Sequence, residues 1–240
     1  TDFRPIVKQC EDINRIYITD LYKGRQISQD GSKIGISPFY MQEKEVFQNI
    51  KTPRIIDVDL AAIIYTSGSS GFPKGAVFTH HNMVSAATSI IEYLENEPED
   101  IIYNVLPLSF DYGLYQLLMT FKFGGTIILE KGINYPFYSL KKIKSEQVTG
   151  LPIVPAIANM LLKIEKLKDI GLNSLRYITN TGQRLPKSII YRLMEALPHV
   201  KIYSMYGLTE CKRVAYLAPE KLARKPESVG KAMPNTEAFI

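Results

Sequence analysis

Strand-like and helix-like runs alternate from Asp59 onward, and this alternation constrains the fold more than any other feature of the sequence. Short apolar runs that suit buried strands are separated by longer stretches with amphipathic helical periodicity. The pattern predicts an α/β fold with parallel sheets flanked by helices. The expected strands cover residues 60–65, 101–106, 126–129, 175–179 and 200–204. The expected helices cover residues 82–94, 112–121, 154–167 and 186–196.

The first part of the chain lacks this regular rhythm. We therefore expect residues 1–58 to form a separate segment and residues 59–240 to form the α/β core. In a doubly wound sheet, ligands bind at loops beyond the carboxyl ends of the strands. The loops to search for chemistry are those that follow Tyr65, Leu106, Thr179 and Ser204.

The composition of the chain limits the class of protein and the kinds of partner to be expected. Of the 240 residues, 45% are hydrophobic and 22% charged, which suits a folded core rather than a disordered chain. The net charge of +5 is spread along the chain without a basic run, so no nucleic-acid partner is expected. No apolar run reaches the ~18 residues of a membrane span, and residues 1–20 do not have the apolar core expected of a signal peptide. The two distant cysteines, Cys10 and Cys211, suit a reducing compartment, and a cytoplasmic protein is expected.

A glycine-rich loop follows the strand that ends at Tyr65. Its glycines allow backbone N–H groups to turn toward an anion, its hydroxyls add donors, and Lys74 adds a positive charge. The P-loop of nucleotide triphosphatases is excluded, because Lys74 is followed by Gly75 rather than by Ser or Thr. The candidate phosphate-binding residues are Thr66, Ser67, Gly68, Ser69, Ser70, Gly71 and Lys74.

This loop carries a family resemblance, and two further segments extend it in the family's order. Residues 65–75 closely resemble the phosphate-binding signature of the AMP-forming adenylate ligase superfamily, which contains acyl-CoA synthetases, peptide-synthetase adenylation domains and luciferases. Residues 206–210 match that superfamily's Tyr-Gly-x-Thr-Glu signature. Residues 179–186 resemble its adenine-binding segment, although Gln183 and Arg184 stand where the family usually has Gly or Ala. Residues 204–220 most resemble an exosortase-associated group of acyl-CoA ligase-like proteins.

The resemblance implies a role for each matched residue. Tyr206 would stack on adenine, Thr209 would contact the α-phosphate of ATP, and Glu210 would help to hold Mg²⁺, which usually takes one or two protein carboxylates. The implied catalytic residues are Lys74, Thr209 and Glu210. The implied ATP-binding set contains the phosphate-loop residues above together with Gly182, Gln183, Arg184, Tyr206, Gly207 and Thr209.

The implied reaction activates a carboxylic acid with ATP to an acyl-adenylate. A thiol, either CoA or a carrier-protein phosphopantetheine, would then take the acyl group. In the superfamily, a ribose-binding aspartate and a small C-terminal domain with an adenylation lysine lie beyond the segment matched here. We therefore expect residues 1–240 to be a part of the large N-terminal domain with little activity alone. An amino-acid adenylation domain and a non-catalytic nucleotide-binding module are the alternatives.

Phe110 and Asp111 are the candidate substrate-binding residues. Residues 109–111, Ser-Phe-Asp, resemble the adenylation domains that activate amino acids, in which the aspartate pairs with the substrate's α-ammonium. The resemblance implies a substrate with an amine near its carboxylate, and the cost of an unpaired carboxylate in an apolar pocket agrees with this. The alternative is that Asp111 caps the helix that follows. Lys212 and Arg213 either steer phosphates or lie on a solvated turn. Cys211 is expected to be a buried or semi-buried thiol without a catalytic role.

Overall fold

The chain divides into two compact units, Thr1–Arg54 and Ile55–Ile240. A computed structural model describes residues 15–18, 35–38, 54–66, 72–133, 135–165 and 167–239. In the first unit, strands β1 (Arg15–Ile18) and β2 (Gly35–Pro38) pair in parallel.

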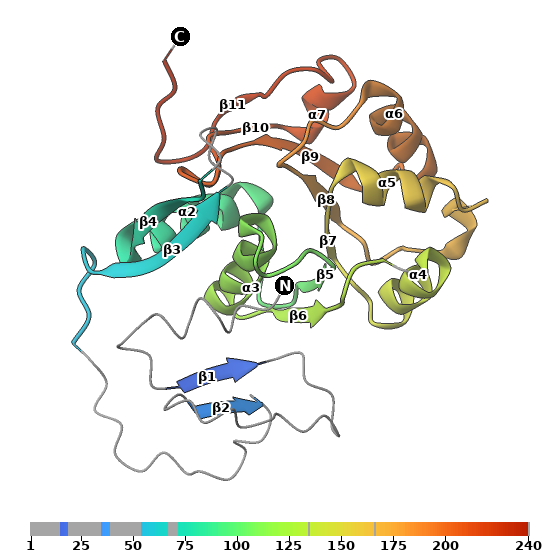
Figure 1. The fold of residues 1–240 in the computed structure, drawn as a ribbon. Coiled ribbons are helices and arrows are strands. Elements are labelled where there is room, and N and C mark those ends of the chain that lie inside the picture. The colour runs from blue at the N-terminus through green and yellow to red at the C-terminus, as the bar shows by residue number, and fades with distance from the viewer. Residues whose placement is uncertain are drawn as a thin grey trace. The chain divides into compact units, whose positions relative to one another are not determined.

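A mostly parallel sheet of seven strands forms the centre of the second unit (Figure 1). Its order is β11-β10-β9-β8-β7-β5-β6. The five strands from β9 to β6 run parallel, whereas β10 and β11 pair antiparallel at one edge. This arrangement confirms the predicted α/β class. The strands are β5 (Ile101–Asn104), β6 (Thr126–Leu129), β7 (Gly150–Ile153), β8 (Tyr177–Asn180), β9 (Lys201–Tyr206), β10 (Ala215–Leu217) and β11 (Lys231–Ala232).

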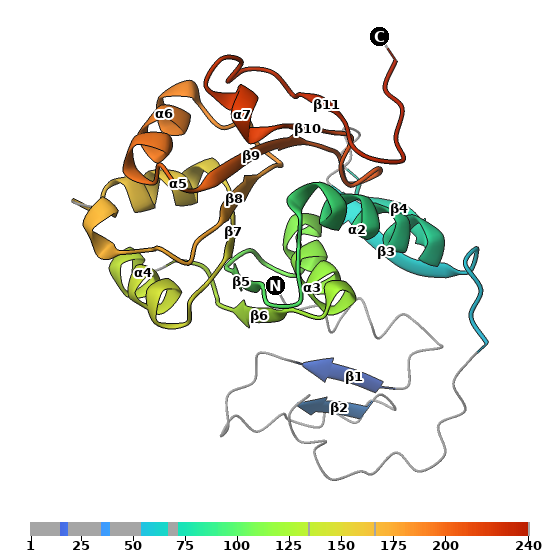
Figure 2. The ribbon, with the colours of Figure 1, turned by 180° about the vertical axis from the view of Figure 1, so that it is seen from behind.

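Helices cover both faces of this sheet. Figures 1 and 2 show α2 and α3 on one face and α4, α5 and α6 on the other. The helices are α2 (His80–Leu94), α3 (Asp111–Phe123), α4 (Pro136–Ser145), α5 (Pro155–Leu162), α6 (Lys187–Ala196) and α7 (Pro219–Leu222), with a 3-10 turn at Leu167–Ile170. None of the helices in the described residues is long and apolar enough to cross a lipid bilayer.

Local sequence explains why these elements form where they do. Every residue of β7 and β8 is buried, as expected for central parallel strands covered on both faces. Helix α2 begins with a capping box, in which Thr79 Oγ1 accepts from the Asn82 N–H at 3.2 Å and Asn82 Oδ1 accepts from the Thr79 N–H at 3.1 Å. Helix α3 ends at Gly124, whose φ of 81° suits the left-handed C-terminal position.

Two of the differences between the structure and the predicted elements concern the central sheet. Strand β3 (Leu60–Thr66) does not enter the parallel sheet but forms a separate antiparallel hairpin with β4 (Lys74–Thr79). The segment between Thr66 and Lys74 therefore connects two antiparallel strands. Helix α4 and strand β7 are missing from the prediction. Pro152 lies within β7, and proline usually argues against a central strand.

Candidate active site

Three parallel strands, β5, β8 and β9, end at the same edge of the sheet, and two neighbouring pockets lie there. The larger, here called the Tyr206 pocket, has a volume of about 400 Å³ and is lined by residues 182–184, 204–208 and 226–229. The smaller, the Arg213 pocket, has a volume of about 200 Å³ and is lined by residues 110–112, 181–182, 207–209, 212 and 213. Both pockets are lined by Gly182, Gly207 and Leu208, so the two pockets adjoin each other.

The Tyr206 pocket joins two segments that the sequence associates with adenine. Gly182, Gln183 and Arg184 follow β8, and Tyr206, which is half exposed, ends β9. Residues 226–229 form a third wall of this pocket. This wall contains Glu227, which was not predicted from the sequence as a site residue. Its carboxylate pairs with Arg184 at 2.7 Å and with Lys187 at 2.9 Å. The hydrogen bond from Lys187 is the main cause that holds the pKa of Glu227 below its ordinary value.

Two glycines allow the pocket walls to approach each other. Gly182 has a φ of 78°, which favours glycine, and a Cβ there would lie 3.1 Å from the Phe110 ring. A Cβ on Gly207 would lie only 1.9 Å from the carbonyl oxygen of Lys212. Glycine is therefore required at residue 207 for the chain to fold back closely on itself.

Residues 206–214 form the turn between the antiparallel strands β9 and β10. The Val214 N–H donates to the Tyr206 carbonyl at 2.8 Å, and the Cys211 N–H donates to the Leu208 carbonyl at 3.2 Å. Within this turn Lys212 has a φ of 63°, a left-handed conformation that is uncommon for lysine. The turn thus carries the matched Tyr-Gly-x-Thr-Glu string on its first half and two buried cations on its second half.

Those two cations surround the carboxylate of Asp111 in the Arg213 pocket. Lys212 Nζ lies 2.8 Å from Asp111 Oδ1, and Arg213 Nη1 lies 3.9 Å from Asp111 Oδ2. The exposed fractions of the three side chains are only 7% for Asp111, 3% for Lys212 and 4% for Arg213. Burial lowers the pKa of Lys212 below its ordinary value, and Asp111 opposes this shift.

Aromatic rings surround the charged cluster. Lys212 Nζ lies 3.3 Å from the centre of the Phe78 ring, and the Arg213 guanidinium lies 4.8 Å from the centre of the Tyr112 ring. Both are cation–π distances. The Tyr112 hydroxyl is hydrogen-bonded to Thr179 Oγ1 at 2.6 Å, and burial raises the pKa of Tyr112. The aromatic walls hold the cations in fixed positions with little access to water.

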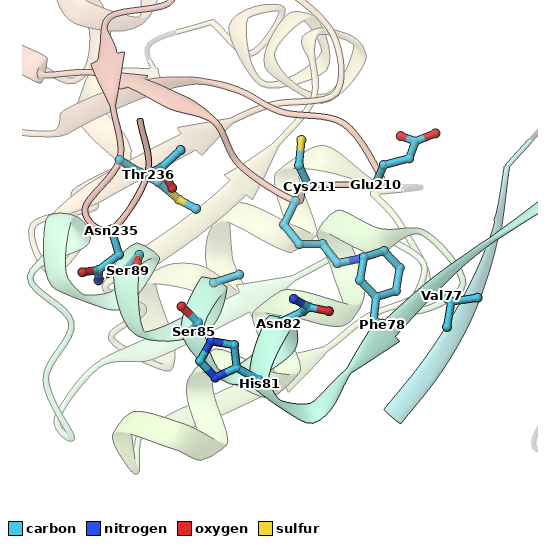
Figure 3. A pocket seen from close by; sticks show the side chains of 13 residues that line it. Val77, Phe78, His81, Asn82, Ser85, Ser89, Glu210, Cys211, Asn235 and Thr236 are labelled. Carbon is cyan, nitrogen blue, oxygen red and sulfur yellow. Dashed lines mark hydrogen bonds between the residues drawn. The ribbon is translucent and has the colours of Figure 1, made fainter. Parts of the chain in front are cut away.

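Glu210 does not line the Arg213 pocket. It lines a third pocket of about 330 Å³, between α2 and the Glu210–Lys212 segment (Figure 3). Its side chain is exposed, and its carboxylate points away from His81 and Ser85 in Figure 3. Within the described ranges, no three His, Cys, Asp or Glu residues gather to hold a metal ion. A single exposed carboxylate nevertheless fits Mg²⁺ that is held mainly by substrate phosphates.

The structure describes only the two ends of the predicted phosphate loop. Thr66 ends β3 and Lys74 begins β4, and the two residues face each other in the hairpin. Lys74 is exposed. Ser67, Gly68, Ser69, Ser70 and Gly71 lie outside the described residues.

The cluster corrects three expectations from the sequence. Asp111 does not cap helix α3, because the N-cap residue is Phe110 and Asp111 lies in the first turn. Lys212 and Arg213 are buried rather than solvated, and Cys211 is exposed rather than buried. Sequence reasoning treated Asp111 as lacking a partner, because Lys212 is distant in the chain and only the turn brings it close. The adjacent basic residues Lys212 and Arg213, close after Glu210, were the sequence signal for such a partner.

Comparison with known proteins places the chain in a family. The model of the AMP-binding enzyme family matches residues 7–240. A 4-coumarate–CoA ligase-like protein of Arabidopsis thaliana is 30% identical over 97% of this chain and 42% of its own length. Gramicidin S synthase 2 of Aneurinibacillus migulanus is 29% identical over 76% of this chain and 4% of its own length.

Solved structures give the same result. The crystal structure of VinN superposes with a TM-score of 0.69 and 34% identity over 77% of this chain and 45% of its own. ATP-bound MatB from Rhodopseudomonas palustris superposes with a TM-score of 0.70 and 26% identity over 78% of this chain and 36% of its own. The chain therefore belongs to the AMP-binding enzyme family of AMP-forming ligases. It spans less than half the length of these relatives.

Proposed function

We propose that the protein containing this chain activates a carboxylic acid with ATP to form an acyl-adenylate. The observation that carries the proposal is the pair of pockets that share Gly182, Gly207 and Leu208. The Tyr206 pocket would receive the adenine and the Arg213 pocket would receive the acid. Their common wall would bring the carboxylate next to the α-phosphate of ATP.

The step is an in-line attack. A carboxylate oxygen forms a bond to the α-phosphorus while the bond from that phosphorus to the bridging oxygen breaks, and pyrophosphate leaves with the electron pair. Positioning and charge stabilisation supply the catalysis. Thr209, on the wall of the Arg213 pocket, would contact the α-phosphate, and Lys74 would neutralise the leaving pyrophosphate. Glu210 would hold Mg²⁺, which neutralises phosphate charge when bound.

A second step would transfer the acyl group to a thiol. The thiol sulfur attacks the carbonyl carbon of the acyl-adenylate, AMP leaves, and a thioester remains. CoA is one acceptor, as in the CoA ligases among the relatives, and the phosphopantetheine of a carrier protein is the other, as in peptide synthetases. The proposal covers both acceptors.

A second candidate is adenylation of an amino acid, which Asp111 favours. Solved structures of VinN include complexes with L-aspartate and 3-methylaspartate. A ligand amine could share the Asp111 carboxylate with Lys212. In an Asp111→Asn variant, the KM of an amino-acid substrate should then rise far more than the KM of the matching acid without the amine.

Exchange of radiolabelled pyrophosphate into ATP by the full-length protein tests the proposal. We expect exchange that depends on an added carboxylic acid and on Mg²⁺. ATP binding without exchange, over a panel of aliphatic, aryl, dicarboxylic and amino acids, would instead support a non-catalytic nucleotide-binding module.

A further inference from the structure

The charges of the Arg213 pocket do not balance. Two cations, Lys212 and Arg213, surround one carboxylate, Asp111, and all three side chains are at most 7% exposed. Arginine stays protonated at any pH of interest. The N-terminus of helix α3, where Asp111 lies, adds further positive potential. The pocket therefore has an excess of positive charge that water can barely screen, and a buried charge without a partner is costly.

Arg213 has donor capacity that the described part of the chain leaves unused. Asp111 is already paired with Lys212, and the 3.9 Å from Arg213 to the second carboxylate oxygen is too long for a hydrogen bond. Arg213 Nη1 donates to the Lys212 carbonyl at 2.9 Å, but buried Nε has no hydrogen-bond partner among the described residues. The buried hydroxyl of Thr181, on the same pocket wall, also lacks one there.

The backbone and the pocket size support a ligand site. The left-handed φ of 63° at Lys212 is strained, and strain of this kind concentrates at functional sites. The volume of about 200 Å³ holds roughly six or seven groups of water size, given the ~30 Å³ that a water molecule occupies in the liquid. A short acid fits this space.

We propose that Arg213 selects a short acid that carries a second carboxylate. This inference rests on the proposed function and names the substrate class of the same site. The planar guanidinium would bind the second carboxylate through its free donors, with Thr181 as an additional hydrogen-bond donor. The first carboxylate would lie toward Thr209 and the Tyr206 pocket, where the adenylate forms.

A panel of four-carbon acids separates the contributions of the second carboxylate and of an amine. Succinate has two carboxylates, butyrate has one, L-aspartate has two carboxylates and an amine, and L-2-aminobutyrate has one carboxylate and an amine. The full-length protein is assayed with each acid by pyrophosphate exchange, and binding of succinate and butyrate is measured by calorimetry. We expect succinate and L-aspartate to exceed their monocarboxylate counterparts in kcat/KM.

The diagnostic variant is Arg213→Met, which keeps the apolar stem and leaves Asp111 paired with Lys212. Its kcat/KM for the dicarboxylates should fall by about 30-fold or more, as expected for removal of a buried charge partner, whereas butyrate should change little. Arg192→Met makes the same change at an exposed arginine of helix α6 and should alter neither value. Arg213→Gln is the substitute if the methionine variant does not fold.

The outcomes separate this inference from the proposed function. Exchange with butyrate but not with succinate, or an equal loss for all four acids in Arg213→Met, overturns the inference and leaves adenylation standing. The equal loss would mean that Arg213 binds the reacting carboxylate or a phosphate. Succinate binding that Arg213→Met abolishes, with no exchange by any acid, supports the inference and overturns adenylation. Failure of the wild type to bind succinate overturns the inference.

Discussion

The ammonium group of Lys212 lies 2.8 Å from a carboxylate oxygen of Asp111, with both side chains buried. The two residues come from opposite walls of the Arg213 pocket, the start of helix α3 and the turn between β9 and β10. The ion pair joins these walls. Removal of either residue would leave the charge of the other buried without this partner, which lowers the free energy of unfolding.

Asp111→Ala should destabilise the protein by about 3–5 kcal/mol, because it leaves Lys212 and Arg213 buried without a counter-charge. Urea unfolding measures this change in the free energy of unfolding. Glu195→Ala, at an exposed position of helix α6, is the control and should stay within about 0.5 kcal/mol of the wild type. Equal effects of the two substitutions would show that the buried pair contributes nothing to folding.

Arg213→Met should leave the stability of the ligand-free protein unchanged or raise it. The substitution removes the cation in excess while the Asp111–Lys212 pair persists, and replacing a buried ion by an apolar group of similar volume is often neutral or stabilising. Thermal unfolding without ligand is the measurement. A fall in Tm comparable to that of Asp111→Ala would mean that Arg213 is part of the folding core rather than reserved for a ligand.

Gly207→Ala should displace the turn that carries Thr209 and Glu210. The added Cβ would lie 1.9 Å from the Lys212 carbonyl oxygen, a backbone atom that cannot move alone. We expect a loss of stability of about 1–3 kcal/mol, as for overpacking in a core, together with loss of pyrophosphate exchange. Gly132→Ala is a comparison without steric conflict, since a Cβ there meets nothing within 4 Å, although its φ of 80° adds some strain. Wild-type exchange by Gly207→Ala would contradict the close approach.

Asp100→Asn should destabilise the protein by about 3 kcal/mol at neutral pH, near the lower end for a broken buried pair because Arg176 is 37% exposed. Burial alone would raise the pKa of Asp100, but hydrogen bonds from Arg176, Asn96 and Thr149 outweigh it and hold that pKa below its ordinary value.

The stabilisation by Asp100 is therefore fully present above the unfolded-state pKa of about 3.9 and is lost as the pH falls toward the lower folded-state pKa. Urea unfolding of both proteins from pH 7 to pH 3 should show a constant difference down to about pH 5 that shrinks below pH 4. A difference that grows on acidification would reverse the sign of this argument.

Lys74→Ala and Glu210→Ala should each reduce adenylation by the full-length protein by about 10²-fold or more, as is typical for removal of a group that stabilises transition-state charge. Pyrophosphate exchange under saturating acid measures the loss. Lys225→Ala, an exposed lysine beyond helix α7, is the control. Turnover at the wild-type rate in either variant would remove that residue from the proposed mechanism.

The sequence predicted much of the fold because its strongest signals are local. The strand-like stretch at β8 and the amphipathic pattern of α6 are set by neighbours in the chain, and both elements form close to where they were expected. Strand β3 was predicted equally well as an element but not as a member of the right sheet, because strand pairing depends on partners that periodicity does not specify.

For the candidate site too, the sequence predicted some features and only the tertiary structure showed others. By itself, the sequence determined the family, through contiguous strings such as residues 65–75 and 206–210, because a loop that binds phosphate needs its glycines and hydroxyls within one segment. Only the tertiary structure decided the state of Asp111, since its partner Lys212 follows about a hundred residues later and approaches only when the β9–β10 turn folds over α3. Burial, which makes the charge of Arg213 significant, is likewise a property of the packed walls and not of the chain.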